Sequence, residues 1–472
     1  MRNLAILAVI LAAATSWTPA QRPNVVLFFI DDLGWADLGC YGSTFYSTPH
    51  LDALAKSGVR FTDAYSACPV CSPTRAALMT GKYPQRCGIT QWIPPGSDRH
   101  LDAAEATLGE AFLAAGYRTG YIGKWHLGER DADHPRHHGF PWTFAVNRAG
   151  QPSSYYFPYK RKPGKRGVMT KNGKKFTVWD VPDLANGKDG DYLTDRLTDA
   201  ALRFITAKGA AQKPFMLCFA HYAIHTPIQP PPALVPGYQQ KAARLGPAPK
   251  PIPGTFGTTS RARQDHAKYA AMMENLDHNV GRVLEALRKN GLSKDTIVVF
   301  ASDNGGLCNL RKRPGPTCNL PMRSGKGWTY EGGIRVPFIV SWPGKIEPSV
   351  SMEPSITMDI YPTLLDLCGL ASRPKQHLDG VSLRPALDGK AGVQGRALGW
   401  SYPHGHGSGH RPSAAWRKDG WKLVRFERSG LTELFHLAED AGETVNLADR
   451  HPERVVRMSK ELDAWLGATA AK

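Results

Sequence analysis

The 472-residue chain has few cysteines and, after its first residues, no long apolar run. Eight cysteines are too sparse in a chain of this length for the disulfide framework that small secreted domains use, although Cys308 and Cys318 flank a short loop and could pair after export. No later segment is apolar over enough residues to cross a bilayer, so we expect no membrane anchor. Repeats and low-complexity segments are also missing. The 42% hydrophobic and 21% charged composition is that of a globular protein, long enough for more than one domain.

The N-terminus has the pattern of a signal peptide. Arg2 precedes an apolar run over residues 4–14, which is too short to span a membrane. Thr18 and Ala20 suit the small-residue positions of a cleavage site. No cysteine lies near that site, which argues against a lipid-anchored protein. We therefore predict a signal peptide over residues 1–20 and export to the periplasm or the medium, with a buried first strand or helix as the alternative.

The chain has fewer acidic than basic residues. The chain has 59 Lys and Arg against 41 Asp and Glu, a formal charge of +18, and much of the excess lies in residues 160–175. Such a charge raises the question of nucleic-acid binding, but a solvated basic loop is an equally good interpretation. For an exported protein an anionic polysaccharide is the more natural partner, because a basic surface steers polyanions toward it. We expect no nucleic-acid partner.

Strand-like and helical patterns alternate along most of the chain. Helical spacing of apolar residues predicts helices over residues 191–205 and 269–289. Alternation of strands with helices implies an α/β fold with a mostly parallel sheet covered on both faces. The predicted strands are residues 25–30, 118–122, 215–219, 296–300 and 337–341.

The pattern changes after residue 373. A proline-rich stretch over residues 227–257 predicts a long surface excursion before that point. After residue 373, Lys418-Asp419-Gly420 is a hairpin signal, and the apolar runs over residues 421–426 and 431–437 flank loops. A final amphipathic helix is predicted over residues 453–466. We therefore expect a large α/β domain over residues 21–373 and a smaller subdomain with an antiparallel sheet over residues 374–472.

Polar residues gather where the predicted strands end, which is where open α/β sheets bind ligands. Carboxylate and amide oxygens suit calcium or magnesium better than zinc. A single Asp at such a position is commonly a helix N-cap, but this explanation is weak for two clusters on separate strands. His221 and His225 are spaced like a pair of zinc ligands, but their segment is not a helix, so zinc is disfavoured. His221 is better explained as a satisfied core histidine. The strand-end residues are Asp31 and Asp32, Lys124 and His126, His221 and His225, and Asp303 and Asn304.

The segment over residues 68–81 combines a pair of cysteines with the signals of a helix. Cys68 and Cys71 form a Cys-x-x-Cys pair, which by itself suggests a redox or metal site. Pro73, however, fits the first turn of a helix and Gly81 fits its C-terminal end. This places residue 71 at a helix N-terminus, where backbone N–H groups favour an anion.

Together these motifs resemble the type I sulfatases, and the resemblance covers nearly all of the chain after the signal peptide. Its centre is the Cys-x-Pro-x-Arg motif, Cys71-Ser72-Pro73-Thr74-Arg75, followed by Leu78-Met79-Thr80-Gly81-Lys82. The other matching segments are Asp31–Gly34, Thr48–Asp52, Gly123–Gly128, His225–Pro227, Ser302–Gly306, Gly325–Gly327 with Glu331–Gly333, and Gly442–Thr444 with Asn446–Ala448.

The resemblance implies a fold related to alkaline phosphatase and a nucleophile made from Cys71. In this family the cysteine is oxidised to formylglycine (3-oxoalanine) by a separate formylglycine-generating or radical-type maturation enzyme. The hydrated aldehyde then supplies two hydroxyls, one for attack on sulfur and one whose deprotonation expels sulfate, a form of nucleophilic catalysis. A serine has no second hydroxyl and could not follow this route.

The resemblance also implies a role for each motif residue. Asp31, Asp32, Asp303 and Asn304, together with residue 71, would hold one calcium ion. Arg75 and Lys124 would hold the diol, and Lys124 and Lys326 would contact the sulfate. His126 would act as the base of the elimination step and His225 as the acid that protonates the leaving alcohol. His404, His406 and His410 lie in a Gly-rich loop that we expect to border the sugar pocket, with a plain surface loop as the alternative.

The chain is most similar in pattern to bacterial enzymes that act on sulfated polysaccharides, in a branch with members on galactose or N-acetylgalactosamine sulfates. The segments that carry this step are Tyr155–Pro158, Tyr192–Arg196, His377–Gly380 and Tyr402–His406. The rival enzyme of the same superfamily is a phosphonate monoester or phosphodiester hydrolase. A rival from another class is a non-catalytic protein that binds sulfated glycans.

Overall fold

We analysed a computed structural model of the chain. It describes residues 22–470, except residues 148, 161–167, 172–173, 178, 208–212, 312–313 and 394. The predicted signal peptide and most of the basic run at residues 160–175 lie outside the described residues. Within the part of the chain that is described, no helix has the length and apolar character needed to cross a bilayer.

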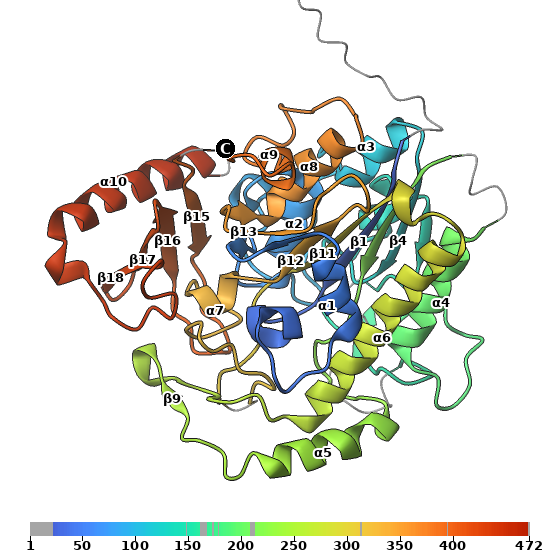
Figure 1. Cartoon of the computed structure of the whole chain (residues 1–472), viewed down its shortest axis with the longest axis horizontal. Coiled ribbons are helices and arrows are strands. Elements are labelled where there is room, and N and C mark those ends of the chain that lie inside the picture. The colour runs from blue at the N-terminus through green and yellow to red at the C-terminus, as the bar shows by residue number, and fades with distance from the viewer. Residues whose placement is uncertain are drawn as a thin grey trace, which may run out of the picture.

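An eight-stranded sheet forms the centre of the molecule (Figure 1). All five predicted strands belong to it, and most neighbouring strands run parallel, as predicted. The exception within the predicted set is β12, which is antiparallel to β11. In sheet order the strands are β13 (Ser349–Ser351), β2 (Val59–Phe61), β12 (Phe338–Ser341), β11 (Thr296–Ser302), β1 (Asn24–Ile30), β8 (Phe215–Ala220), β4 (Arg118–Gly123) and β5 (Trp142–Phe144).

Strand β1 shows why the sheet is covered on both faces. The side chains of Val26, Phe28 and Ile30 point to one face of the sheet and pack into one core. The intervening side chains, from Val25 onward, point to the other face and pack into a second core. Both sets are almost fully buried, as expected for a strand that is apolar in every position. The first face carries α1 (Pro49–Lys56), α4 (Leu193–Ile205) and α6 (Ala267–Lys289), and the second carries α2 (Cys71–Thr80), α3 (Leu108–Ala114), α8 (Ile360–Leu367) and α9 (Arg384–Leu387).

The C-terminal part forms a separate antiparallel sheet, on the left in Figure 1. The predicted hairpin joins two of its strands through Asp419 and Gly420, both with positive φ, which a two-residue turn of this kind requires. The predicted terminal helix, α10 (Pro452–Thr469), packs on this sheet. Its strands are β15 (Leu398–Tyr402), β16 (Ser413–Lys418), β17 (Trp421–Phe426) and β18 (Thr432–His436).

The predicted boundary at residue 373 stays a proposal. Leu383, just before α9, and Leu387, within it, pack into a core of the large sheet. The segment just after the predicted boundary therefore still contributes to the domain that contains this sheet. The proline-rich excursion contains one helix, α5 (Val235–Arg244), which packs on α6. The remaining short elements are β3 (Ala64–Tyr65), β14 (Ser355–Ile356), β6 (Val168–Lys171), β7 (Lys174–Thr177), β9 (Ile252–Pro253), β10 (Thr259–Ser260) and α7 (Glu331–Ile334).

All eight cysteines are unpaired thiols in the structure. Cys308 and Cys318 are both buried and do not form the disulfide that the sequence left open. The structure therefore owes none of its stability to cross-links between cysteines.

Candidate active site

The strand ends that carry polar residues lie side by side. Strands β11, β1, β8 and β4 are consecutive in the sheet and parallel, so their carboxyl ends share one edge. Helix α2 brings Cys71 to this edge, and a loop after β11 brings Lys326. Every residue predicted to act in catalysis or metal binding is therefore gathered in one place by the topology.

Three carboxylates and three cations at this edge form buried ion pairs, which we call the cleft cluster. All six side chains are almost fully buried, so the pairs lie away from the screening of water. The pairs, with their nitrogen-to-oxygen distances, are Lys124–Asp31 at 2.7 Å, Lys326–Asp32 at 2.6 Å and Arg75–Asp303 at 2.7 Å.

The acidity of the three carboxyls differs. Burial, with a smaller contribution from neighbouring carboxylates, holds the pKa of Asp31 well above its ordinary value although Lys124 lowers it. Burial also raises the pKa of Asp32 and Asp303, but adjacent cations, Lys326 for Asp32 and Arg75 for Asp303, outweigh it and lower the net pKa of both. Asp31 is thus the carboxylate whose charge is least compensated by the protein.

Two oxygen atoms of this site have no hydrogen-bond partner among the described residues. They are Asp31 Oδ1 and Asn304 Oδ1, and both are buried. Buried polar atoms without a partner are rare in native structures and commonly indicate an ion or a water. Asp31, Asp32 and His225 each offer a ligand atom, all within 4.8 Å of one another. The site therefore fits a cation, and the two unpartnered atoms are oxygens, which favours a hard cation.

Cys71 begins helix α2 and faces His126. Its Sγ lies 3.2 Å from His126 Nδ1. The other ring nitrogen, Nε2, donates to the carbonyl of Ile93 at 2.9 Å, and because a carbonyl can only accept, Nε2 carries the proton and Nδ1 has a free lone pair. Burial and then Lys124 hold the pKa of His126 well below 6.5, so the ring is neutral and able to accept a proton from residue 71.

Helix α2 has the ends that the sequence predicted. Gly81 ends it in the left-handed conformation with φ of 71°. A Cβ at this position would lie 2.3 Å from His377 Cβ, so the close approach of the two segments also requires glycine. The helix is thereby held with its N-terminus, and Cys71, at the sheet edge.

His225 lies on the other side of the site. Its Nδ1 donates to the carbonyl of Thr226 at 2.9 Å, and its Nε2 lies 3.5 Å from Asp32 Oδ2. Burial lowers the pKa of His225 to about 3, although Asp32 raises it. The neutral ring therefore has its proton on Nδ1 and presents an unprotonated Nε2 toward the site.

His221 differs from the sequence interpretation in one respect. It is buried in the core, as expected, and its ring stacks on Phe219 with centroids 3.9 Å apart. Neither ring nitrogen, however, has a hydrogen-bond partner among the described residues. Burial alone lowers the pKa of His221 to about 3. It is therefore a core histidine held neutral by burial and not by a satisfied polar network.

A cavity of about 430 Å³ opens above these groups. Cys71, His126, His225 and Lys326 line it, while the carboxylates, Arg75 and Lys124 lie behind. The sequence did not identify several other lining residues, because single aromatic and amide side chains in loops have no periodicity that marks them. These residues are Trp92, Ile93, Pro95, Gln151 and Trp179.

The three histidines of the Gly-rich loop occupy different places. His406 lines the cavity. His404 does not line it, and its Nε2 lies 3.0 Å from Thr90 Oγ1. His410 also does not line it and packs edge-on against Trp328, almost fully buried. The cavity therefore receives one of the three histidines directly.

Comparison with known proteins extends the likeness over the whole chain. A family model described as "Sulfatase" matches residues 23–370, and one described as "N-sulphoglucosamine sulphohydrolase, C-terminal" matches residues 324–469. The chain is 35% identical to N-acetylgalactosamine-6-sulfatase of Canis lupus familiaris over 78% of this chain and 66% of that protein. It thus spans just under two thirds of that relative's length.

In two bacterial matches the similarity covers a larger share of both proteins. The chain is 30% identical to a sulfatase of Formosa agariphila, over 94% of this chain and 89% of that one. Among solved structures it is similar to Ps i-CgsB in complex with k-i-k-neocarrahexaose, with a TM-score of 0.77 and 31% identity over 94% of this chain and 93% of that chain. Since the first family model spans well over half of the sequence, the chain belongs to the sulfatase family.

Proposed function

We propose that this protein is exported and removes O-sulfate from a sulfated carbohydrate, using a formylglycine made from Cys71 and one calcium ion. The observation that carries the proposal is the approach of Cys71 Sγ to His126 Nδ1, 3.2 Å, at the floor of the cavity. A nucleophile precursor and a proton acceptor there adjoin buried cations that suit an anionic substrate.

Asp31, Asp32, Asp303 and Asn304, together with residue 71, would hold the calcium ion. The unpartnered Asp31 Oδ1 and Asn304 Oδ1 supply oxygen donors for it. Bound there, calcium would neutralise sulfate charge and lower the pKa of the hydrated aldehyde.

The two histidines differ in what they can do with a proton. His126 keeps its Nε2 proton on the Ile93 carbonyl, so its Nδ1 accepts the proton of the hydroxyl whose loss expels sulfate. His225 keeps its Nδ1 proton on the Thr226 carbonyl, so its Nε2 is the atom that donates to the leaving alcohol. The negative sulfate beside it favours the protonated ring, which offsets the effect of burial on its pKa.

The cations orient the reacting groups. Arg75 donates to Asp303 and also, through Nη1 at 2.8 Å, to the carbonyl of Lys124, so it fixes the β4 end against the metal ligands. Lys326 lines the cavity and is the cation best placed to contact the sulfate. Lys124 lies deeper and acts on the diol and the sulfate from behind.

Two relatives support a carbohydrate substrate. One is named for N-acetylgalactosamine 6-sulfate, and the other was solved with a neocarrahexaose. The tryptophans on the cavity wall, Trp92 and Trp179, suit a pyranose ring, and His406 suits a hydroxyl or sulfate beside it. We therefore propose a galactose or N-acetylgalactosamine sulfate within a polysaccharide, and maturation by a formylglycine-generating or radical-type enzyme.

The test compares matured wild-type protein with two variants at position 71. Sulfate release from sulfated galactosides should fall at least about a thousandfold in Cys71→Ala with the fold intact, because the nucleophile is gone. Cys71→Ser retains a single hydroxyl and should stop after the first turnover. Mass analysis of the peptide containing residue 71 should show the aldehyde in active wild-type protein.

Three results would overturn the proposal. Full sulfate release by Cys71→Ala would remove the nucleophile from the mechanism. Much faster hydrolysis of aryl phosphodiesters or phosphonate monoesters than of sulfates would favour the rival enzyme of the same superfamily. Binding of sulfated glycans with no sulfate release by aldehyde-containing protein would indicate a non-catalytic binder.

A further inference from the structure

The segment over residues 323–333 forms a loop that carries Lys326 near its tip, and we call it the Lys326 loop. Its ends are joined, because Gly332 N–H donates to the carbonyl of Arg323 at 2.9 Å. At the tip, Lys326 Nζ reaches Asp32 Oδ1 at 2.6 Å. The position of the two joined ends is therefore one of the constraints on the Lys326 ammonium group, beside the hydrogen bond from Lys326 N–H to the carbonyl of Gly306 at 3.1 Å.

The tip also contacts the segment that carries the nucleophile. Gly327 N–H donates to the carbonyl of Pro69, two residues before Cys71, at 2.8 Å. A Cβ at Gly327 would lie 2.1 Å from His406 Nδ1, so the loop passes directly against this cavity residue. A displacement of the Lys326 loop would disturb several walls of the cavity together.

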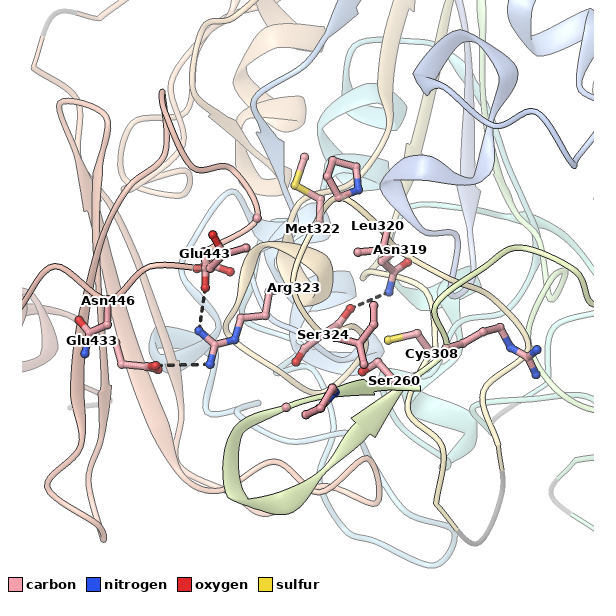
Figure 2. A pocket seen from close by; sticks show the side chains of 17 residues that line it. Ser260, Cys308, Asn319, Leu320, Met322, Arg323, Ser324, Glu433, Glu443 and Asn446 are labelled. Atoms are coloured by element: carbon pink, nitrogen blue, oxygen red, sulfur yellow. Dashed lines mark hydrogen bonds and ion pairs between the residues drawn. The ribbon is translucent and has the colours of Figure 1, made fainter. Parts of the chain in front are cut away.

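One residue of the C-terminal part, Glu443, contacts both ends of this loop. Its carbonyl accepts from Arg323 Nη1 at 2.8 Å, and its Oε2 accepts from Glu331 N–H at 2.7 Å. Figure 2 shows Arg323 between Glu443 and Glu433, whose Oε1 lies 3.4 Å from Arg323 Nη2. Glu443 itself is fully buried.

The Glu443 carboxylate is held by a buried chain of alternating charges, which we call the junction cluster. Lys422, from strand β17, places Nζ 2.8 Å from both Glu331 Oε1 and Glu443 Oε1. Three carboxylates and three cations alternate along it, so the cluster is neutral when ionised. In order, its members are Arg417, Asp63, Arg335, Glu331, Lys422 and Glu443.

Trp328 and Tyr330 anchor the middle of the loop in an apolar core, and two further features concern the polar contacts of Arg323 and Glu443 at its ends. A cavity of about 350 Å³ lies beside Arg323, so packed apolar side chains do not hold this arginine on all sides (Figure 2). Glu443 has φ of 52°, a left-handed conformation that glycine adopts more readily than glutamate. A glutamate persists in such a conformation when its surroundings hold it there.

We propose that Glu443 is a positioning residue for catalysis, which places Lys326 by holding both ends of the Lys326 loop from the C-terminal part of the chain. This rests on the role proposed above for Lys326. It also gives a purpose to the Gly442-Glu443-Thr444 motif, which lies outside the cavity. The C-terminal sheet thereby becomes part of the machinery that sets the reaction rate.

The test is a double-mutant cycle on matured protein. Glu443→Gly removes the carboxylate and suits the positive φ, but it leaves the junction cluster one negative charge short, so some loss of thermal stability is expected and kinetics are measured at a temperature where the variant is folded. Its kcat/KM for sulfate release should fall roughly tenfold to a hundredfold, the scale of misplacing a group in the active site. In the Lys326→Ala background the same substitution should have no further effect, because the group it positions is gone.

A second substitution and a control variant complete the experiment. Arg323→Gln breaks the contact with the Glu443 carbonyl, and its loss of kcat/KM should also vanish in the Lys326→Ala background. Glu461→Gln is the control, since Glu461 bonds Trp416 and Lys418 within the C-terminal part and is remote from the loop. It should leave kcat/KM unchanged.

The outcomes separate this inference from the proposed function. Wild-type kcat/KM in both Glu443→Gly and Arg323→Gln would overturn the inference, and so would losses of equal size with and without Lys326. If Glu443→Gly does not fold, the Arg323→Gln cycle decides by the same criterion. Wild-type kcat/KM in Lys326→Ala would instead contradict the proposed role of Lys326.

Discussion

The cleft cluster and the junction cluster contain the same numbers of positive and negative side chains, but they differ in whether every carboxylate oxygen has a partner. Each contains three buried carboxylates and three cations. In the junction cluster five of the six carboxylate oxygens accept a hydrogen bond, and the sixth, Glu443 Oε1, accepts none but lies 2.8 Å from Lys422 Nζ in an ion pair. In the cleft cluster each cation pairs with one carboxylate, and Asp31 Oδ1 has no partner among the described residues.

This difference separates a structural site from a ligand site. A buried charge network in which every oxygen has a partner holds two parts of a chain together, and loss of one member leaves an uncompensated charge. A network with oxygens left over is complete only with a ligand. The predictions below test whether the two clusters behave in these opposite ways.

The largest effect on stability is expected in the junction cluster. Lys422→Met leaves Glu331 and Glu443 buried without their shared cation and should lower the free energy of unfolding by about 3–5 kcal/mol. Chemical denaturation measures the loss. The double variant Lys422→Met/Glu443→Gln should recover part of it, because one of the two charges is also removed. Calcium affinity should be unchanged, and an altered affinity would argue against the separation of the two clusters.

The cleft cluster should show the reverse. Asp31→Asn should lower kcat roughly 10²–10³-fold, about 2.7–4 kcal/mol, by removing one charge that organises the cation. In calcium-free buffer Asp31→Asn should be no less stable than wild type, because the pKa of Asp31 is already raised and Lys124 still has Asp303 and Asp32 nearby. Kinetics and denaturation in calcium-free buffer measure both quantities. Strong destabilisation with kcat unchanged would show that Asp31 is structural.

The sequence was sufficient to place the cleft cluster at one edge of the sheet. Residues 25–30 and 296–300 are apolar throughout, as buried parallel strands require, and their carboxyl ends are followed by Asp31 and Asp303. The motif resemblance then assigned roles. What could not be predicted is which lysine pairs with which aspartate, since these contacts join residues 93 and 294 positions apart.

The junction cluster was not predicted at all. Its members come from loops, a short helix and two strands of the C-terminal sheet, and no local pattern marks a charge as buried. Glu443 belonged to a matched motif, but its partners Arg323 and Glu331 lie 120 and 112 residues away. Strand β15 was missed for a related reason. Its Gly399 weakens a strand pattern, and the structure uses this glycine for close approach of Trp465.

Calcium itself should stabilise the protein by a smaller amount. At a hundred times its dissociation constant a ligand that binds only the folded state adds about 2.7 kcal/mol. Wild type and Lys422→Met should both gain this amount, and Asp31→Asn should gain little. Thermal unfolding with calcium, magnesium and zinc in turn measures the effect. Greater stabilisation by zinc than by calcium would indicate that His225 is a ligand and that the oxygen-only set is wrong.

The last effect appears only in acid and concerns a buried ionisable group with no charged partner, His221. Its pKa is about 3 in the folded protein and 6.5 when exposed, so the unfolded chain binds the proton more readily. Stability from this residue is therefore present above pH 6.5 and is lost as the pH falls toward 3, by about 1.4 kcal/mol per pH unit. His221→Phe should flatten the fall in unfolding free energy over this range by about that slope, whatever its effect on packing. His278→Gln, at an exposed position on α6, should leave the slope unchanged. An unaltered slope in His221→Phe would show that the acid sensitivity comes from the carboxylates of the two clusters.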